Sequence, residues 1–122
     1  MLKTLRIPVL ATLLGVMALA AGPAAADALP RYQTARHVVS GYGSHRFTVT
    51  FPGGRAARVY VRGDRSSDLD LYVYDENGNL IGKDLGFTDS CVVRWTPRWT
   101  GPFVVVVKNR GRRANLYRVW TN

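Results

Sequence analysis

Three aspartates around one strand-like segment are the first residues whose types and spacing could do chemistry. Asp68 and Asp70 lie two positions apart, so on a strand their side chains share one face, about 6.5–7 Å apart along the chain. Carboxylate oxygens are the ligands that Ca²⁺ prefers. We predict Asp68, Asp70 and Asp75 as candidate calcium ligands, with Asp84 or Asp89 as alternative third members. The competing reading is that Asp68 caps a turn while Asp70 hydrogen-bonds backbone or pairs with an arginine.

A basic cluster near the C-terminus could bind polyanions. It consists of Lys108, Arg110, Arg112 and Arg113 in a polar loop. Arginine forks match carboxylate, sulfate and phosphate groups, so the cluster predicts an acidic polymer as partner. The alternative is a solvated loop that only keeps a small domain soluble. Export, argued below, counts against nucleic acid as the physiological ligand.

Tryptophan provides a third candidate contact. Trp99 lies in the turn between Pro97 and Pro102 and is predicted to be exposed, where its flat ring could stack on a sugar. This carbohydrate-binding reading requires a coplanar, exposed tyrosine beside it. Trp95 and Trp120 fall on predicted strands and are expected in the core.

Catalytic groups are few and badly spaced. The two histidines, His37 and His45, lie eight positions apart near the start of the predicted fold, and two are too few for a zinc site. No Gly-x-Ser-x-Gly elbow is present. The single cysteine, Cys91, cannot form an internal disulfide, and we interpret it as a small core residue, the alternatives being an intermolecular disulfide or a reactive thiol. We expect no enzymatic activity.

The elements that must position these residues are strands. Apolar and polar residues alternate with a period of two in several segments, and Asn77-Gly78 is a strong hairpin signal. No segment has a helical period. The predicted strands cover 47–51, 57–62, 68–74, 91–96, 103–107 and 116–120, with a return strand beginning at 80–81 and a loop over 82–89. This pattern predicts an all-β antiparallel sandwich of about seven or eight strands.

The N-terminal segment is expected to be a cleaved signal peptide. Lys3 and Arg6 precede an apolar run, and small residues follow it, which is the pattern of a secretory signal. Cleavage after Ala26, or alternatively after Ala28, leaves 122 − 26 = 96 residues with 15 basic and 8 acidic side chains, a net charge of +7. We expect a secreted or periplasmic protein without a membrane span, a lead-in segment over 27–43 and one domain over 44–122.

Two motifs in the predicted domain resemble the bacterial pre-peptidase C-terminal domain. Segment 68–78 reads Asp-Leu-Asp-Leu-Tyr-Val-Tyr-Asp-Glu-Asn-Gly, and segment 96–106 reads Thr-Pro-Arg-Trp-Thr-Gly-Pro-Phe-Val-Val-Val. The family typically shows an Asp-x-Asp-Leu-Tyr-Val strand, then a Pro…Thr-Gly-aromatic segment and a valine-rich strand. Asn115-Leu116-Tyr117 is similar to its last strand. Pro102 occupies the place of the expected aromatic residue, which predicts an irregular start of that strand.

The resemblance implies a jelly-roll-like sandwich without catalytic residues. Members of the family accompany exported peptidases and other secreted enzymes, and the related collagen-binding domains of bacterial collagenases bind calcium. We therefore expect an exported, non-catalytic binding or adhesion module, stabilised by Ca²⁺ in the manner of those relatives. Its partner would be a cell-surface or extracellular polymer, or an exported enzyme acting in trans. The alternatives are a structural envelope-associated protein and, more weakly, a carbohydrate-binding module.

Overall fold

The computed structural model describes residues 32–33 and 36–122, and these residues form strands and loops. The expected signal peptide lies outside the described residues. Within the described part of the chain no helix is long and apolar enough to cross a membrane. The described strands are β1 (Tyr32–Gln33), β2 (His37–Val39), β3 (Ser44–Phe51), β4 (Ala57–Arg62), β5 (Leu69–Tyr74), β6 (Leu80–Asp84), β7 (Ser90–Trp95), β8 (Gly101–Asn109) and β9 (Asn115–Thr121).

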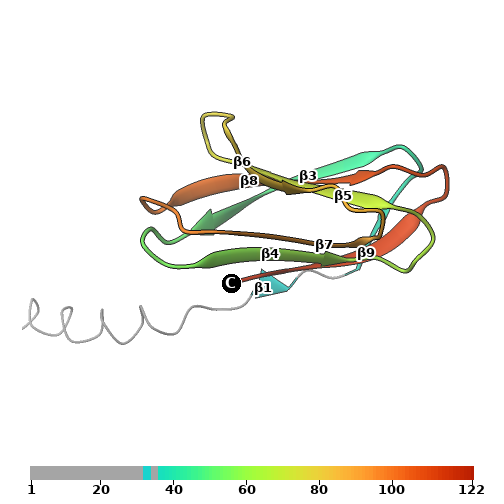
Figure 1. The fold of residues 1–122 in the computed structure, drawn as a ribbon, viewed down its shortest axis with the longest axis horizontal. Coiled ribbons are helices and arrows are strands. Elements are labelled where there is room, and N and C mark those ends of the chain that lie inside the picture. Colours follow the sequence, from blue (N-terminus) through green and yellow to red (C-terminus); the bar gives the residue numbers. More distant parts are fainter. Residues whose placement is uncertain (1–31, 34–35) are drawn as a thin grey trace, which may run out of the picture. The chain divides into compact units, whose positions relative to one another are not determined.

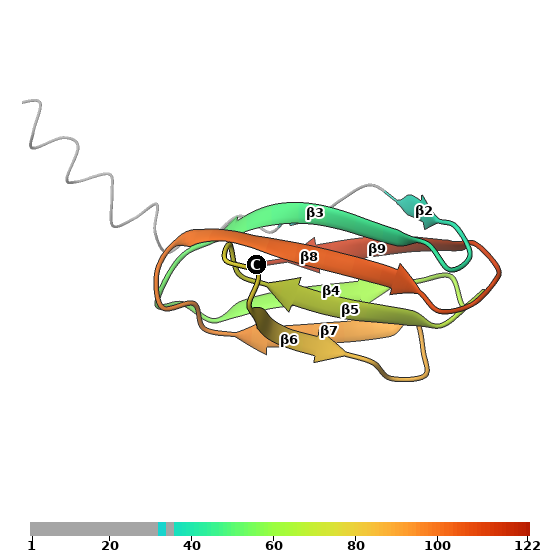
Figure 2. The ribbon, with the colours of Figure 1, turned by 90° about the horizontal axis from the view of Figure 1, so that it is seen from above.

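The strands form two antiparallel sheets that lie face to face (Figure 1). One sheet has the order β1-β9-β4-β7, with β2 also pairing with β9, and the other has the order β3-β8-β5-β6. Figure 2 shows the second sheet from above, with β8 between β3 and β5. Because β1 and β2 both pair with β9, they together occupy one strand position in the first sheet. Successive strands then alternate between the two sheets, except that β5 and β6 are neighbours in one sheet, and this is the strand order of a jelly roll, a double Greek key. The predicted fold class is confirmed.

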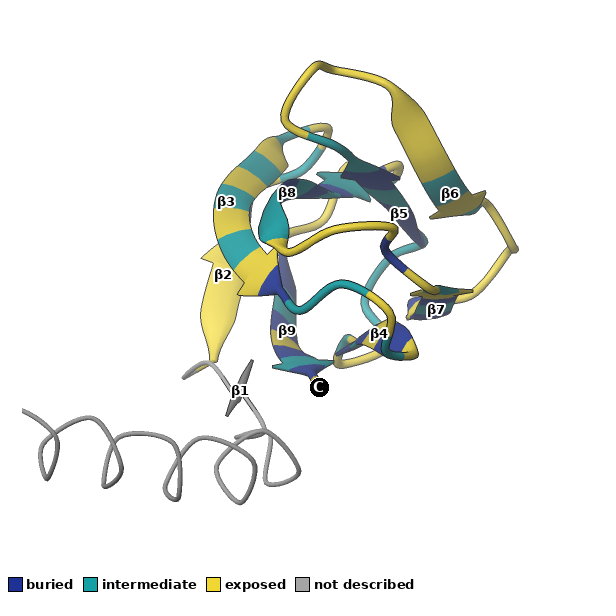
Figure 3. Ribbon diagram, turned by 90° about the vertical axis from the view of Figure 1, so that its left-hand side faces the viewer, coloured by how far each residue is buried: buried dark blue, intermediate teal, exposed yellow. Residues whose placement is uncertain are grey.

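Period-two alternation builds the core between the sheets. Along β4 and β9 every second side chain is buried, and the buried bands are visible along the strands in Figure 3. On β8 the odd-numbered residues from Phe103 to Asn109 are buried. The valine-rich run therefore also alternates, with its even-numbered residues half-buried on the outer face. The buried apolar residues are Val39, Phe51, Ala57, Val59, Val61, Leu69, Leu71, Val73, Cys91, Val93, Phe103, Val105, Val107, Tyr117 and Val119.

The predicted Asn-Gly hairpin joins β5 to β6. Gly78 has φ of +85°, a conformation that costs glycine little. The Asp75 carboxylate closes the turn by accepting the backbone N–H groups of Asn77 and Asn79 at 2.9 and 2.8 Å. Its other oxygen accepts the Asn79 side-chain amide at 2.9 Å. Asp75 is thus committed to its own turn.

The structure differs from the sequence-based expectations in three local details. β6 continues to Asp84, although the sequence predicted a loop from Gly82. The expected lead-in contributes β1 and β2, which pair with β9. The ladder between β8 and β3 runs without a shift through Pro102. There β8 has no partner on its β5 side, since that ladder begins only at Val104, and a strand with one neighbour tolerates proline.

The outer edge of β7 is closed by a side chain. β7 pairs with β4 on one side only. On its other side, the Val92 N–H donates to the Asp84 carboxylate at 2.9 Å. Asp84 therefore satisfies one backbone donor of an edge strand from the end of β6.

Candidate functional site

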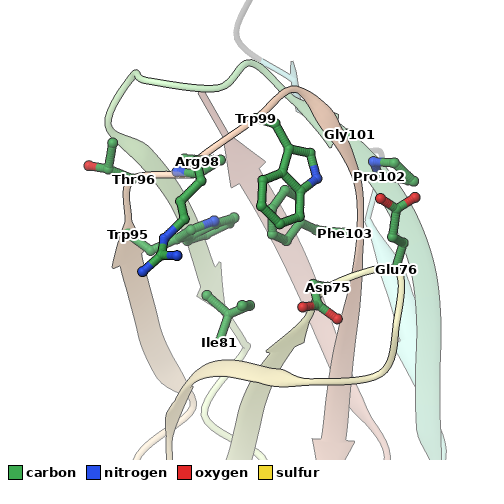
Figure 4. A pocket seen from close by; sticks show the side chains of 11 residues that line it. Asp75, Glu76, Ile81, Trp95, Thr96, Arg98, Trp99, Gly101, Pro102 and Phe103 are labelled. Carbon is green, nitrogen blue, oxygen red and sulfur yellow. The ribbon is translucent and has the colours of Figure 1, made fainter.

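A pocket of about 340 Å³ lies at one end of the sandwich, between the β5–β6 turn and the β7–β8 loop (Figure 4). The β5–β6 turn contributes acidic residues, β7 and β8 contribute aromatic residues, and the loop between them contributes both aromatic and basic groups. The lining residues are Asp75, Glu76, Ile81, Trp95, Thr96, Pro97, Arg98, Trp99, Gly101, Pro102 and Phe103.

Aromatic rings form the inner wall of the pocket. The Trp95 ring packs against Phe51 and Phe103, with centroids 4.8 and 5.2 Å apart, so the wall is continuous with the core. Trp99 is 58% exposed, as its turn predicted. Its neighbours in the pocket are Trp95 and Phe103, and these two rings stand where a tyrosine was expected. The Nε1 of Trp95 is buried without a hydrogen-bond partner.

The loop that carries Trp99 is held in place by the β3–β4 turn. The Gly53 N–H donates to Thr100 Oγ1 at 2.9 Å, and the Gly54 N–H donates to the Pro97 carbonyl at 2.7 Å. A Cβ at Gly53 would lie 2.5 Å from the Trp99 Cα, so only glycine permits this close approach. The exposed ring therefore rests on a fixed backbone.

Charged groups surround the aromatic wall. Figure 4 shows Asp75 and Glu76 on one side of Trp99, and Arg98 extending on the other. A Cβ built at Gly101 would lie 3.7 Å from Glu76 Oε1 and 3.8 Å from Trp99 Nε1, so both groups flank this glycine. The Asn79 side-chain hydrogen bond, aided by the backbone of the turn, lowers the pKa of Asp75.

The three predicted calcium ligands are not brought together. Asp68 precedes β5 and Asp75 follows it, so the strand separates them by roughly 20 Å. Within residues 36–122 no three histidine, cysteine or acidic side chains are arranged to hold a metal ion. The three carboxylates are kept apart because the hairpin requires Asp75 at the far end of the strand.

Asp70 instead pairs with an arginine, which was the alternative reading. Arg110 Nε lies 3.6 Å from Asp70 Oδ2, and the Asp70 side chain is buried. Burial, and then the neighbouring Asp68 charge, raise the pKa of Asp70, while Arg110 and Lys108 act against them. Burial also raises the pKa of Asp68, and its Oδ1 has no hydrogen-bond partner. Asp84 and Asp89, the alternative third ligands, each accept backbone N–H groups elsewhere: Asp84 from Gly86 and Val92, and Asp89 from Arg65.

The predicted basic cluster divides in two. Arg110 is engaged with Asp70, and Lys108 lies on β8 directly opposite Asp70 of β5. Arg112 and Arg113 are exposed in the loop before β9. The loop is therefore less basic towards solvent than its sequence indicates.

Cysteine and histidine show no arrangement for nucleophilic catalysis among the described residues. Cys91 is buried, and its Sγ donates to the Leu69 carbonyl at 3.1 Å. Burial raises the pKa of its thiol to about 12, so the nucleophilic thiolate is disfavoured. The Nδ1 of His45 lies 2.7 Å from the Tyr117 hydroxyl, and the His37 ring packs on both. The interpretation of Cys91 as a core residue is confirmed.

Sequence reasoning identified one ring of the pocket and missed its partners. Trp95 was assigned to the core, although it both packs there and lines the pocket. Glu76 and Arg98 carried no signal of their own. Only the strand order could have indicated this pocket, because it places the β5–β6 turn and the β7–β8 loop at the same end of the sandwich.

Comparison with known proteins adds no family assignment. The sequence matches no protein-family model, and it matches no curated protein. The function of the pocket is therefore inferred from its geometry and chemistry.

Proposed function

We propose that the protein is an exported, non-catalytic binding module that binds carbohydrate in the aromatic pocket. The observation that supports this most directly is the exposed Trp99 ring on a fixed loop, beside a pocket walled by Trp95 and Phe103. Ligand pockets are typically apolar with a few placed polar groups. A sugar matches this combination, because its ring has an apolar face and polar hydroxyl edges.

The charged groups of the pocket have evident roles in such a complex. Glu76 is an acceptor for sugar hydroxyls, and the Arg98 guanidinium is a donor. Trp99 would stack on the C–H face of one ring. This placement uses contacts from two loops held by the sandwich, which is where binding residues usually occur.

The lowered pKa of Asp75 supports binding over hydrolysis. Glycoside hydrolysis uses a pair of carboxyl groups, one of which has a raised pKa and donates a proton. The pKa of Asp75 is shifted in the opposite direction, and its oxygens are occupied by its own turn. Asp75 is therefore unsuited to act as the acid.

Export and attachment complete the proposal. The N-terminal sequence has the pattern of a secretory signal, and the motifs at 68–78 and 96–106 resemble a family that accompanies secreted enzymes. A module of that kind holds an exported enzyme, or the protein itself, near an extracellular polymer. Its carbohydrate site would select that polymer.

The test measures the binding of neutral oligosaccharides by tryptophan fluorescence and by calorimetry. Cello-, xylo-, malto- and chito-oligosaccharides sample the common linkages. At least one should bind with a change in tryptophan emission, and Trp99→Ala should abolish that binding. The control is Phe87→Ala, since Phe87 is 96% exposed in the loop before β7, away from the pocket at the other end of that strand. Equal binding by both variants, or release of shortened sugars by the wild type, would contradict the proposal.

A structural envelope role is the second candidate. It is favoured by apolar side chains that are exposed on β6 and the loop after it, namely Leu80, Ile81, Leu85 and Phe87. Exposed apolar groups of this kind can mark an interaction surface. Self-association measured by light scattering, reduced by Leu80→Ser or Phe87→Ser, would favour this role.

A further inference from the structure

The outer face of the β9-β4-β7 sheet gathers arginines that are far apart in the sequence. Each strand of this sheet turns its buried residues to the core and its alternate residues outward. Four of the outward residues are exposed arginines, and the large residues between them are aromatic or aliphatic. The arginines are Arg58, Arg62, Arg94 and Arg118, and the central residues are Tyr60, Val92 and Trp120.

The strand register sorts the arginines into two rows. Arg58 of β4 is directly opposite Arg94 of β7. Arg62 of β4 is directly opposite Arg118 of β9. Four residues of extended chain separate Arg58 from Arg62, so the two rows lie about 13 Å apart. The face thus carries a pair of guanidinium groups at each end.

These pairs carry an energetic penalty in the isolated protein. Like charges directly opposite on neighbouring strands destabilise a sheet. The ion pair of Arg110 with Asp70 involves none of these four arginines, and among residues 36–122 none of the four forms an ion pair with a carboxylate. An external anion bound between the two arginines of a pair would offset their mutual repulsion.

Aromatic side chains occupy the middle of the face. Tyr60 lies opposite Trp120 on one side and Val92 on the other. The rings of Tyr60 and Trp120 are 5.3 Å apart at an interplanar angle of 33°. They line a shallow hollow of about 410 Å³ together with Arg58 and Arg94. The centre is half-buried, whereas the arginines at its rim are exposed.

We propose that this face binds an acidic polysaccharide whose charged sugars alternate with uncharged ones. An uncharged sugar would lie on Tyr60 and Trp120, and the acidic groups of the neighbouring sugars would reach the two arginine pairs. Arginine forks bind carboxylate or sulfate in two-point contacts. This site is independent of the pocket at the end of the sandwich, because the two share no lining residue.

The distribution of charge favours polysaccharide over other polyanions. A nucleic-acid strand carries a phosphate on every nucleotide, so it would place phosphates above the uncharged centre as well as above the two rows. Tyr60 and Trp120 also contact each other, which leaves no gap for a base between them. An anionic bilayer is flat, and the rings here lie in a hollow between the arginines. A polymer with spaced charges matches the face best.

The experiment measures binding of hyaluronan oligosaccharides, in which uronate alternates with an uncharged sugar. Neutral dextran, a single-stranded oligonucleotide and phosphatidylserine vesicles are compared at the same ionic strength. We expect hyaluronan to bind most tightly, with an affinity that falls as salt is raised. Arg58→Gln with Arg94→Gln, and separately Arg62→Gln with Arg118→Gln, should each lower the affinity about tenfold. Trp120→Leu should lower it with no change in net charge.

The matched control is Arg112→Gln with Arg113→Gln, which removes the same charge from the β8–β9 loop and should leave the affinity within about twofold. A circular dichroism melt of every variant separates loss of binding from loss of folding. Three results would overturn the proposal: an equal loss in the loop variant, tighter binding of the oligonucleotide or vesicles, or no binding of hyaluronan by folded wild-type protein. Trp99→Ala should leave hyaluronan binding unchanged, so failure of this site and failure of the pocket are distinguishable.

Discussion

Replacement of Asn115 by alanine should destabilise the domain more than any exposed polar substitution. Asn115 is fully buried at the start of β9. Its side-chain amide donates to the Ser67 carbonyl, the Ser67 hydroxyl and the Asp89 carboxylate at 3.0, 3.2 and 3.1 Å. Its carbonyl oxygen accepts the Asp64 N–H at 3.1 Å. One side chain thus ties two loops to the last strand.

The expected loss follows from these four contacts. A hydrogen bond contributes about 1 kcal/mol net, and a buried group left without a partner costs about 1–3 kcal/mol. Water can reach part of the loop and replace some contacts, so we expect Asn115→Ala to lower the free energy of unfolding by about 3 kcal/mol. For a domain of this size, that loss lowers Tm by roughly 12–24 °C.

The assay is guanidinium unfolding followed by tryptophan fluorescence, with a thermal melt. The control is Asn79→Ala, an exposed residue whose side chain makes one hydrogen bond, to Asp75, and which should cost under about 1 kcal/mol. Equal losses in the two variants would refute the reasoning. Asn115→Asp supplies a second check, because it places a carboxylate beside Asp89 and should be most harmful above the pKa of the new group.

Three further predictions concern ionisable groups. Burial, and then the charge of His37, lower the pKa of His45, so the unfolded chain binds this proton more readily than the folded protein does. The free energy of unfolding should therefore rise with pH up to about 6.5 and then level off. His45→Gln should flatten this rise in thermal melts across that pH range. An unchanged slope would contradict the assignment. Cys91 should resist a thiol reagent in the native protein and react in guanidinium, since its thiol is buried and its pKa is about 12; rapid native labelling would show that the core opens. Because Asp75 is remote from Asp68, millimolar calcium should leave Tm unchanged relative to chelator, and a rise that Asp68→Asn removes would show that the loop reorganises around the ion.

The alternation of apolar and polar residues predicted most of the strands, because each sheet has one face in the core and one face outside it. Leu69, Leu71 and Val73 are fully buried as their period indicates. The start of β6 was predicted, but its continuation from Gly82 was taken for a loop, because β6 lies at the edge of its sheet and none of its residues is buried. β1 and β2 were missed since a strand of two or three residues is defined by its partner, here β9, and has too few residues to show a period.

The binding surfaces depend on register, which a single strand does not encode. Alternation alone indicates that Arg58 and Arg62 point outward. Their meeting with Arg94 and Arg118 depends on which strands are neighbours and on their alignment. Trp120 illustrates the same dependence on register. Its strand was predicted correctly, but the prediction that its side chain lies in the core is wrong, because Trp120 is on the outer face beside Tyr60.

The contact between Asp84 and the edge of β7 has a consequence for the protein at high concentration. A free strand edge is a template on which another chain can add a strand, the first step of many aggregates. Asp84 occupies the Val92 N–H on that edge and leaves a negative charge where a second backbone would have to approach. This carboxylate therefore disfavours the addition of a second chain at the edge of β7.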